Sequence, residues 1–391
     1  MILRNGSRTP VRVVLAGARG HGRRHLENIR RLERAGLVEL AGVCETRPLA
    51  AAEFAGAPVA QDADFAALLG RTGAALAVVS TPIPTHTDFA VAAAGHGVHL
   101  LLEKPPAPSF ALYERIEAAC RSAGVACQIG FQSLGSHALP AVRALVAEGA
   151  VGAVRGIGAA GAWVRDEAYF RRAHWTGRRR LDGADVGDGV LTNPLAHTVA
   201  TALALDGTAR ARDVTGIDLE LYRAYDIEAD DTSAVRLTTA RGTEIVAAVT
   251  LCAERAAEPY VMVHGTRGRI TFWYKEDRVL LQRAGHGPEE ITYPRTDLLG
   301  NLLDHLRDGT PLLAPVAAAG AFMRVAEAVR TAPAPVPLPA AAWREVPAAG
   351  PAGARRVVPG VDALVAAGAE RLALYSELGA PWAAGSEVSP A

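Results

Sequence analysis

A lysine followed by a proline is the first candidate for chemistry in this sequence. The apolar run Leu100-Leu101-Leu102 ends in Glu103-Lys104-Pro105. Of the 41 basic residues only Lys104 and Lys275 are lysines, which leaves 39 arginines. An arginine keeps its proton in a protein, whereas a lysine can release its proton when burial lowers its pKa. Lys104 is therefore a candidate for chemistry, and the alternative is a residue that only ends a strand.

A histidine in the second half of the chain is the next candidate. Asparagine before proline is typical of an N-cap and the first helical residue, so we expect a helix from Asn193 through Ala204. Residues four apart share a helix face, which places Asn193 beside His197. The positive end of the helix dipole favours neutral imidazole, which can act as a base. The alternatives are a plain N-cap for Asn193 and a hydrogen-bonded core histidine for His197.

A glycine-rich turn follows the first predicted strand, Val11 to Ala16. Gly17 and Gly22 hold the outer positions of the spacing G-x-G-x-x-G, but Arg19 stands where the middle glycine belongs. Such a turn, opening a helix, lets backbone N–H groups approach a pyrophosphate. A plain tight turn is the alternative for this loop taken alone.

The second predicted strand, Val38 to Cys44, leads directly into Glu45. An acid at this position can accept hydrogen bonds from the adenosine ribose hydroxyls, which favours NAD. Arg47 could instead hold the 2′-phosphate of NADP. We therefore predict NAD as the cofactor, with NADP as the alternative.

Strands and helices alternate up to residue 131. We expect helices at 62–69, 87–95 and 109–123 and strands at 74–80, 98–102 and 125–131. Regular alternation predicts a parallel sheet with helices on both faces, and ligands of such sheets bind beyond the carboxyl ends of the strands. Ser80-Thr81-Pro82 with His86, and Glu103-Lys104-Pro105, lie at two such ends.

Three motifs together, the glycine turn, Ser80-Thr81-Pro82 with His86, and Glu103-Lys104-Pro105, resemble those of the glucose-fructose oxidoreductase and inositol dehydrogenase family, also called the Gfo/Idh/MocA family. In that family the lysine of the Glu-Lys-Pro motif is catalytic and lies close to the nicotinamide and the substrate, which implies this role for Lys104. The family places an acid, or sometimes an asparagine, four residues before a catalytic histidine. The resemblance therefore implies catalytic roles for Asn193 and His197, and it raises the expectation of a cis bond between Lys104 and Pro105.

The resemblance also implies two binding regions. Similar proteins line the substrate pocket with the segment corresponding to 169–178, where stacking and arginine donors suit a polyhydroxylated or carboxylated ring. The alternative is a surface loop with Trp175 as a packing anchor. The residues expected at the substrate are Tyr169, Arg172, Trp175 and Asn193. The residues expected at the cofactor are Gly17, Arg19, Gly20, His21, Gly22, Glu45, Thr46, Arg47, Ser80, Thr81, Pro82, His86, Glu103 and Lys104.

The pattern changes after residue 131. Predicted strands at 154–164, 214–222, 233–238, 243–251, 261–265 and 269–274 are joined in part by short turns, which indicates hairpins. The predicted fold class is α/β, with an N-terminal Rossmann fold that contains a parallel sheet and a C-terminal α/β domain. The resemblance implies that the sheet of this second domain is large, open and mostly antiparallel.

The expected domains are 1–131, which binds NAD(P), and 132–331, which binds the substrate and forms homo-oligomer contacts. Residues 332–391 are expected to be an Ala/Pro-rich strap followed by a helix, 361–378, that packs back, and by frayed final residues.

Composition narrows the class of protein. Half of the residues are hydrophobic and 21% are charged, which is a globular composition. Basic and acidic residues are equal in number, so no net field favours nucleic acid or a membrane surface. No apolar stretch is long enough to span a membrane, and residues 1–10 lack the apolar core of a signal peptide. The four cysteines have no metal-ligand spacing, so we expect buried, reduced thiols and no metal site; they are Cys44, Cys120, Cys127 and Cys252. Together these features predict a cytoplasmic protein.

The sequence thus predicts an NAD(P)-dependent oxidoreductase acting on a secondary hydroxyl or ketone of a sugar, nucleotide sugar or cyclitol. His197 would be the acid or base and Lys104 would stabilise the alkoxide, with the possibility that the two exchange roles. One alternative is a redox-neutral NAD-dependent sugar hydrolase or epimerase. Another is a catalytically silent nucleotide-binding protein.

Overall fold

The chain folds into two compact units in the computed structural model, which describes residues 9–347, 353–383 and 389–390. Unit 1 comprises Met1–Gly135 with Thr296–Ala319, and unit 2 comprises Ser136–Arg295 with Gly320–Ala391. The expected polar N-terminus up to residue 8 and most of the expected frayed end lie outside the described residues. None of the described helices is long and apolar enough to cross a membrane.

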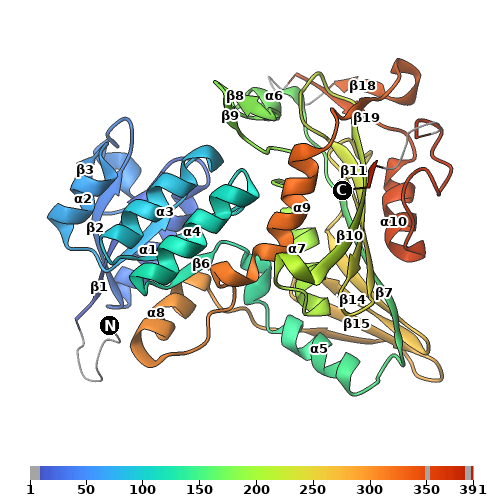
Figure 1. The fold of residues 1–391 in the computed structure, drawn as a ribbon, viewed down its shortest axis with the longest axis horizontal. Helices are drawn as coiled ribbons and strands as arrows, with labels where there is room; N and C mark the ends of the chain where they lie inside the picture. The colour runs from blue at the N-terminus through green and yellow to red at the C-terminus, as the bar shows by residue number, and fades with distance from the viewer. Residues whose placement is uncertain (1–8, 348–352, 384–388, 391) are drawn as a thin grey trace. The chain divides into compact units, whose positions relative to one another are not determined.

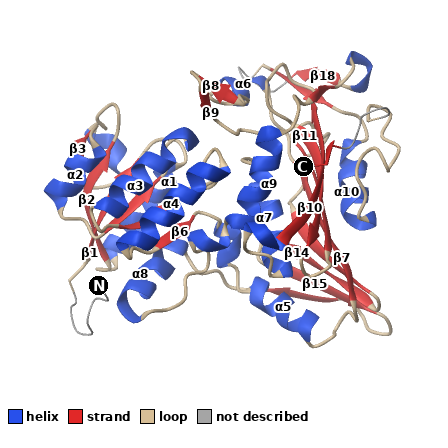
Figure 2. Ribbon diagram, viewed as in Figure 1, coloured by secondary structure: helices blue, strands red, loops and turns tan. Residues whose placement is uncertain are grey.

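Unit 1 contains the predicted parallel sheet (Figures 1 and 2). Its six strands run in the order β3-β2-β1-β4-β5-β6, and every neighbouring pair is parallel. This order places the first strand at the centre, with the chain winding outward in both directions, as in dinucleotide-binding folds. The strands are β1 Val11–Ala16, β2 Val38–Cys44, β3 Ala60–Asp62, β4 Leu76–Val79, β5 His99–Leu102 and β6 Cys127–Ile129.

The helices of unit 1 begin and end at the residues that the sequence provides for capping. Asp64 accepts the amide of Ala67 at the start of one helix, and Ser109 accepts the amide of Leu112 at the start of another. Gly73 and Gly124 end the same two helices in the left-handed conformation. The helices are α1 Gly22–Arg34, α2 Phe65–Thr72, α3 His86–Gly95 and α4 Phe110–Ala123, with short 3-10 turns η1 Ala51–Phe54, η2 Ile83–Thr85 and η3 Gln132–Gly135.

One helix returns to unit 1 from far along the chain. Helix α8, Leu298–Asp308, buries a row of leucines in the same core as strand β1 and helix α1, and the short turn η5, Val316–Ala318, follows it. The buried Gln128 of β6 donates to the carbonyl of Leu298 over 2.7 Å and accepts the amide of Ala314 over 3.0 Å. The sequence placed residues 296–319 with the second half of the chain because no local pattern shows which core an amphipathic helix will join.

Unit 2 is built on a large mixed sheet with strand order β16-β15-β14-β13-β7-β12-β11-β10-β17, and β20 pairs with β10. The pairs β7–β12 and β10–β17 are parallel, and the remaining neighbours are antiparallel. The mostly antiparallel sheet is therefore as predicted. The strands are β7 Val154–Ala162, β10 Val214–Arg223, β11 Thr232–Thr239, β12 Glu244–Thr250, β13 Tyr260–Gly265, β14 Gly268–Trp273, β15 Arg278–Arg283, β16 Glu289–Thr292, β17 Val336–Pro337 and β20 Ser389–Pro390.

Helices cover both faces of this sheet, with α7 and α9 on one side and α10 on the other (Figure 2). Strand β7 permits this close packing because it is rich in glycine. A Cβ atom on Gly158 would lie 1.8 Å from the carbonyl oxygen of Ala369 in α10, and one on Gly161 would lie 2.8 Å from the side chain of Leu195, just before α7. The helices are α5 Ala138–Ala147, α6 Glu167–Arg171, α7 Ala196–Asp206, α9 Gly320–Thr331 and α10 Val361–Arg371, with 3-10 turns η4 Ala211–Asp213 and η6 Ala340–Ala342.

The segment predicted as a strap contains short pieces of structure. Within it, strands β18, Arg344–Pro347, and β19, Ala354–Val357, form a two-stranded ladder. Elsewhere in unit 2, β8, Arg180–Leu181, and β9, Ala184–Asp185, form a second small ladder. The terminal helix packs against the core of unit 2, but it ends at Arg371 and not at residue 378 as expected, and the ring of Trp382 beyond it lies 4.8 Å from the ring of Tyr222. All four cysteines are buried and free, as predicted.

Candidate active site

The glycine turn of unit 1 packs closely against the end of strand β4, so side chains are excluded at Gly17 and Gly22. Gly17 has φ +78°, and a Cβ atom there would lie 2.5 Å from the carbonyl oxygen of Ser80. A Cβ atom on Gly22, the first residue of α1, would lie 1.7 Å from the carbonyl oxygen of Gly17. Gly20 also has positive φ, at +56°. The turn is therefore a cradle that only glycine can form, at the N-terminus of a helix where a pyrophosphate binds well.

Glu45 lies at the carboxyl end of β2 and faces this turn. Its Oε1 atom accepts the backbone amides of Ala18 and Arg19 over 2.5 and 3.1 Å. The guanidinium of Arg19, in the place of the middle glycine, lies 3.3 Å from Glu45 Oε2 and bonds to Glu53. Thr46 and Arg47 are exposed, and the carbonyl of Arg47 accepts Arg19 Nη1 over 2.8 Å. Two carboxylates beside the turn disfavour a 2′-phosphate, which agrees with NAD.

His86 connects the two strand-end motifs of unit 1. Its ring is 1% exposed, with Nε2 2.8 Å from the carbonyl oxygen of Thr81 and Nδ1 2.9 Å from that of Pro105. Burial lowers the pKa of His86, against the two carbonyl contacts that raise it. A neutral imidazole carries one N–H and donates to one carbonyl at a time. His86 therefore positions the loops after β4 and β5, where Ser80 follows β4 and Pro82 precedes η2.

A buried carboxylate organises the residues around the Glu-Lys-Pro motif. Glu103 is 5% exposed, and its Oε1 atom lies 2.8 Å from His25 Nε2, 2.9 Å from Gln132 Nε2 and 3.4 Å from His21 Nε2. Its Oε2 atom accepts the amide of Lys104 over 3.1 Å. Burial alone would raise the pKa of Glu103, but the hydrogen bonds to His21 and His25 outweigh it and hold the pKa well below the usual range. Glu103 is thus an internal anion that links the glycine turn to Lys104.

Lys104 is the second residue after strand β5 and is half-buried. Its bond to Pro105 is cis, as the sequence suggested. Lys275, the other lysine, is partly exposed and pairs with Glu258 over 2.6 Å, in unit 2. The structure thus assigns the second lysine to a surface ion pair, and Lys104 keeps the place at a strand end where ligands of parallel sheets bind.

Sequence reasoning missed two members of this network, His25 and Gln132. His25 follows His21 by four residues on α1, a spacing that places both on one helix face, so it could have been found. Gln132 carries no such signal. Among the described residues, His21, His25 and Glu103 are the one group whose nitrogen and oxygen ligand atoms all lie within 4.8 Å of one another, a spacing that a metal ion could use. The sequence predicted no metal site.

In unit 2, the expected start of the catalytic helix is wrong by three residues. Helix α7 begins at Ala196, and Asn193 lies in the preceding turn, where its amide donates to the carbonyl of Gly189 over 2.9 Å. The side chain of Thr192 closes that turn on Gly187 and Gly189. Asn193 therefore does not cap the helix.

The side chain of Asn193 instead bonds to a carboxylate that sequence reasoning did not select. Its Nδ2 atom donates to Asp188 Oδ1 over 2.5 Å, and the other oxygen of Asp188 accepts the amide of Gly177 over 2.7 Å. Asp188 is 5% exposed. An acid five residues from Asn193 within a glycine-rich turn gave no periodic signal, because the turn rather than a helix brings them together. Asp188 thus places a negative charge beside Asn193.

His197 is the second residue of α7 and is half-buried. Its ring centre lies 6.4 Å from that of Tyr274. The position in the first helical turn, which favours neutral imidazole, is as predicted even though the helix starts later.

The expected substrate segment stacks aromatic and cationic side chains. Asp166 caps the short helix α6 by accepting the amide of Tyr169 over 2.9 Å. The guanidinium of Arg172 lies 3.6 Å from the centre of the Tyr169 ring and 5.2 Å from that of Trp175. Burial raises the pKa of Tyr169, so this ring stays un-ionised at neutral pH. Tyr169, Arg172 and Trp175 therefore form one cluster.

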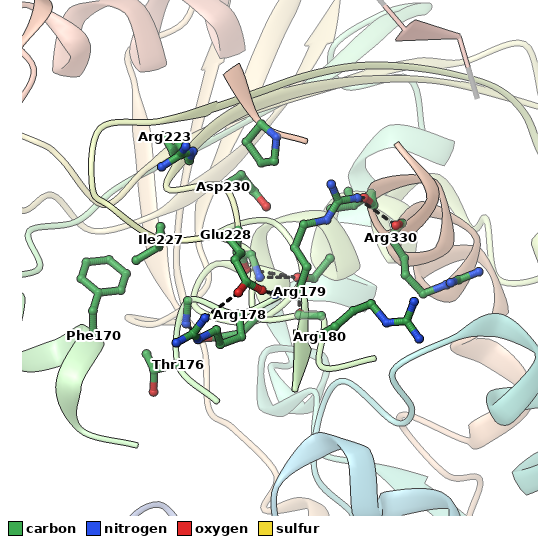
Figure 3. A pocket seen from close by; sticks show the side chains of 18 of the residues that line it. Phe170, Thr176, Arg178, Arg179, Arg180, Arg223, Ile227, Glu228, Asp230 and Arg330 are labelled. Carbon is green, nitrogen blue, oxygen red and sulfur yellow. Dashed lines mark hydrogen bonds and ion pairs between the residues drawn. The ribbon is translucent and has the colours of Figure 1, made fainter. Parts of the chain in front are cut away.

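A cavity of about 1210 Å³ lies in unit 2 beside this cluster (Figure 3). Its wall includes Arg172 and Thr176 from the substrate segment. Asp188 and Thr192 also line it, and Asn193 is the next residue. The predicted cofactor residues all belong to unit 1, whereas the predicted substrate residues, Asn193 and His197 belong to unit 2. Within unit 2, the cavity wall joins Arg172 to Asp188, which bonds to Asn193.

Family models match most of the chain. Residues 11–131 match the family described as "Oxidoreductase family, NAD-binding Rossmann fold", and residues 140–271 match "GFO/IDH/MocA C-terminal domain". The chain belongs to the Gfo/Idh/MocA oxidoreductases. It carries the NAD-binding Rossmann fold of that family, which the glycine cradle and Glu45 fit.

Solved Gfo/Idh/MocA structures share the fold. The WlbA dehydrogenase from Bordetella pertussis, crystallised with NADH and UDP-GlcNAcA, is 22% identical with a TM-score of 0.68, covering 82% of this chain and 94% of that one. An inositol dehydrogenase homolog from Azotobacter vinelandii, complexed with NAD+, is 14% identical with a TM-score of 0.66, covering 83% and 94%.

A curated relative matches over a shorter region. The 4-carboxy-2-hydroxymuconate-6-semialdehyde dehydrogenase of Sphingobium sp. (strain NBRC 103272 / SYK-6) is 28% identical over 122 residues, which is 31% of this chain. The match spans 38% of that relative's length.

Proposed function

We propose that this Gfo/Idh/MocA oxidoreductase is an NAD-dependent dehydrogenase that interconverts a secondary hydroxyl and a ketone on a sugar, nucleotide sugar or cyclitol. Unit 1 would hold the cofactor and unit 2 the substrate. The observation that carries the proposal is that a chain of this family has a lysine just after a strand end in unit 1 and a histidine in a first helical turn in unit 2. The nucleotide-sugar ligand of the WlbA dehydrogenase, UDP-GlcNAcA, supports the substrate class.

Oxidation of an alcohol needs three functions. The bound nicotinamide supplies the hydride acceptor for the carbon-bound hydrogen. In our proposal His197, as neutral imidazole, accepts the hydroxyl proton, and the ammonium of Lys104 stabilises the oxygen while negative charge develops on it. Reduction reverses these transfers.

Asn193 would orient the reacting hydroxyl by hydrogen bonding. An amide cannot transfer a proton as an acid can. The carboxylate of Asp188 accepts a hydrogen bond from Asn193 Nδ2 over 2.5 Å and thereby fixes the orientation of the Asn193 amide. Asn193 is in this view a substrate contact and Asp188 a positioning residue.

The test compares two catalytic variants with matched controls. Lys104→Met and His197→Gln should each lower the rate of NADH formation at least about 100-fold, since general acid–base groups contribute this much. Lys275→Met removes the other lysine, and His286→Gln removes an exposed histidine of unit 2; both should keep full activity. If Lys104→Met and His197→Gln both stayed within about threefold of the parent, the assignment of roles would be wrong.

The same assay separates the redox-neutral alternative. A net dehydrogenase accumulates NADH in proportion to substrate consumed, whereas a hydrolase or epimerase consumes substrate with no net change in NADH. Homo-oligomer formation through the sheet of unit 2 also stays a prediction, and sedimentation of the purified chain would test it.

A further inference from the structure

The cavity of unit 2 is larger than a simple polyol requires. Its volume of about 1210 Å³ exceeds the range of about 300–1,000 Å³ that is common for small-molecule sites. It begins beside Asn193, at Asp188 and Thr192, and extends to the turn between β10 and β11 and to the end of α9. A substrate whose reacting hydroxyl lies near Asn193 would leave space in the cavity for a second chemical group.

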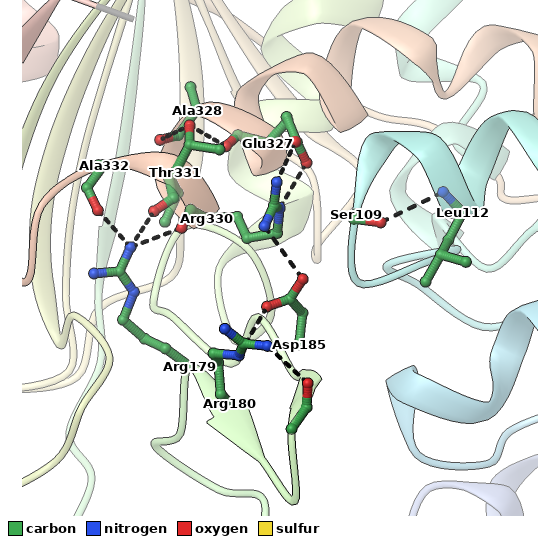
Figure 4. A network of polar contacts seen from close by, with 12 residues as sticks. Ser109, Leu112, Arg179, Arg180, Asp185, Glu327, Ala328, Arg330, Thr331 and Ala332 are labelled. Atoms are coloured by element: carbon green, nitrogen blue, oxygen red, sulfur yellow. Dashed lines mark hydrogen bonds and ion pairs between the residues drawn. The ribbon is translucent and has the colours of Figure 1, made fainter.

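The wall of the cavity carries more positive than negative charge. Seven arginines line it, against five carboxylates. The carboxylates are already engaged: Asp185 accepts from Arg330 over 3.2 Å and lies 3.6 Å from Arg180 (Figure 4), and the buried Asp230 accepts the amide of Val190 and the hydroxyl of Ser233. A cleft with an excess of one sign concentrates ligands of the opposite sign.

Most of the arginines have partners that use their charge or their N–H groups. Arg178 pairs with Glu228 over 2.5 Å, and Arg223 lies 3.7 Å from Asp226. Arg179 donates to four backbone carbonyls at and beyond the end of α9 and so has a structural role. These side chains contribute to the field in the cavity but are not the best candidates for direct contact with a ligand.

Arg172 differs from them. Within the described part of the chain no carboxylate lies within ion-pair distance of Arg172, and its Nη1 atom donates to the carbonyl of Tyr169 over 3.2 Å. Its guanidinium lies over the rings of Tyr169 and Trp175, which hold it by cation–π contact. A guanidinium held in place with several N–H groups still available is suited to bidentate contact with a carboxylate or phosphate.

A second, independent observation also indicates a ligand. Thr176 is 6% exposed and lines the cavity (Figure 3), and its hydroxyl has no hydrogen-bond partner among the residues that the structure describes. Buried hydroxyls are nearly always paired, so an unpaired one needs an explanation. An oxygen of a bound ligand would provide the missing partner.

We propose that this cavity binds an anionic group of the substrate, a phosphate or a carboxylate, through Arg172 and Thr176. The inference rests on the proposed function in one respect only, that the cavity serves the substrate of the dehydrogenase. The substrate is then an acidic or phosphorylated sugar derivative, and a neutral polyol is a poor ligand.

Calorimetric binding to the full chain saturated with NADH tests the proposal with three matched probes: glucose, glucuronate and glucose 1-phosphate. At least one anionic probe should bind tighter than glucose by about ten- to a hundredfold, the range expected for hydrogen bonds to a charged group. The preference should weaken as salt is raised. Glucuronate alone identifies a carboxylate and glucose 1-phosphate alone a phosphate.

Variants show whether the named residues are responsible. Arg172→Met should remove the preference and leave glucose binding unchanged, and Thr176→Val should weaken only the anionic probe. Arg155→Met is the matched control, because Arg155 is an exposed arginine of unit 2 outside the cavity wall. Arg172→Lys, which keeps the charge without the planar fork, should lie between the parent and Arg172→Met.

The proposal is overturned if all three probes bind equally, if neither anionic probe binds at about 10 mM, or if Arg172→Met keeps the preference. The two proposals can be contradicted independently. Anion binding without NADH formation would contradict the dehydrogenase proposal and support the anion site. Turnover of a neutral polyol that Arg172→Met does not change would support the dehydrogenase proposal and contradict the anion site.

Discussion

Replacing Glu103 by glutamine should destabilise unit 1 by about 2–3 kcal/mol, the size of one or two hydrogen bonds to a buried charge. Glutamine has one acceptor oxygen, whereas Glu103 uses two. If that oxygen takes the place of Oε1 beside His25 and Gln132, the new NH₂ group faces the amide of Lys104, and donor meets donor. If the oxygen faces the amide of Lys104, the NH₂ group opposes the donor of Gln132. Neither orientation satisfies every partner.

Hydrogen exchange of peptides from α1 and β5 measures this effect directly. A loss of about 2–3 kcal/mol corresponds to about 30- to 150-fold faster exchange where opening of unit 1 controls the rate. Glu114→Gln, an exposed acid on α4, is the matched control and should exchange like the parent. The pKa of Glu103 is held below its usual range, so its contribution is complete above the ordinary pKa of glutamate and is lost as the pH falls through the folded value. Exchange in Glu103→Gln within about twofold of the parent at neutral pH would refute the reasoning.

Three further predictions concern other buried groups. Burial raises the pKa of Asp231 to about 6, so the folded state holds a proton on this carboxyl group that the unfolded state has already lost, and the free energy of unfolding falls as the pH rises. From about pH 4.5 to about pH 7 the parent should lose about 2 kcal/mol of this free energy relative to Asp231→Asn. Urea unfolding followed by tryptophan emission measures it, since all five tryptophans lie in unit 2. Asp188→Asn should lower kcat at least about tenfold with little change in the melting temperature, because it loosens Asn193; an unchanged kcat would contradict the positioning role. Gly17→Ala should abolish the rise in melting temperature that NAD produces in the parent, because its Cβ atom would overlap Ser80, and a parent-like rise would show that the turn can adjust.

The first half of the chain could be predicted closely because its signals are local. Apart from the short edge strand β3, the strands from Val11 to Ile129 are short, largely apolar runs, and two of the connecting helices, α2 and α4, have capping residues such as Ser109 and Gly124. The order of a sheet wound by right-handed crossovers then follows from general rules. Lys104 could be selected for the same reason, since it stands at the end of such a run in a chain with only one other lysine.

The features that could not be predicted depend on contacts distant in sequence or on turn geometry. Helix α8 joins the core of unit 1 after residues 136–295 have intervened, and its leucines would suit either unit. Asn193 has the sequence of an N-cap but bonds to Asp188, because the preceding turn on Thr192 and Gly189 delays the helix. Thr176 is an ordinary loop residue in sequence, and only the fold shows that its hydroxyl is buried.

The glycines of β7 give the C-terminal helix a part in the geometry of the reaction centre. Residues 156–161 form a layer one backbone thick, with α10 against one side and the entry to α7, which carries His197, against the other. Enlarging Gly158 would displace α10, and enlarging Gly161 would displace Leu195 two residues before His197. Removing α10 would expose this thin layer to water, so a chain shortened to residue 360 should lose catalytic competence although α10 lies on the face of the sheet opposite to α7 (Figure 2). The last helix is a support for the opposite face of the sheet, and trimming or tagging the C-terminus is an indirect way to change the enzyme's turnover.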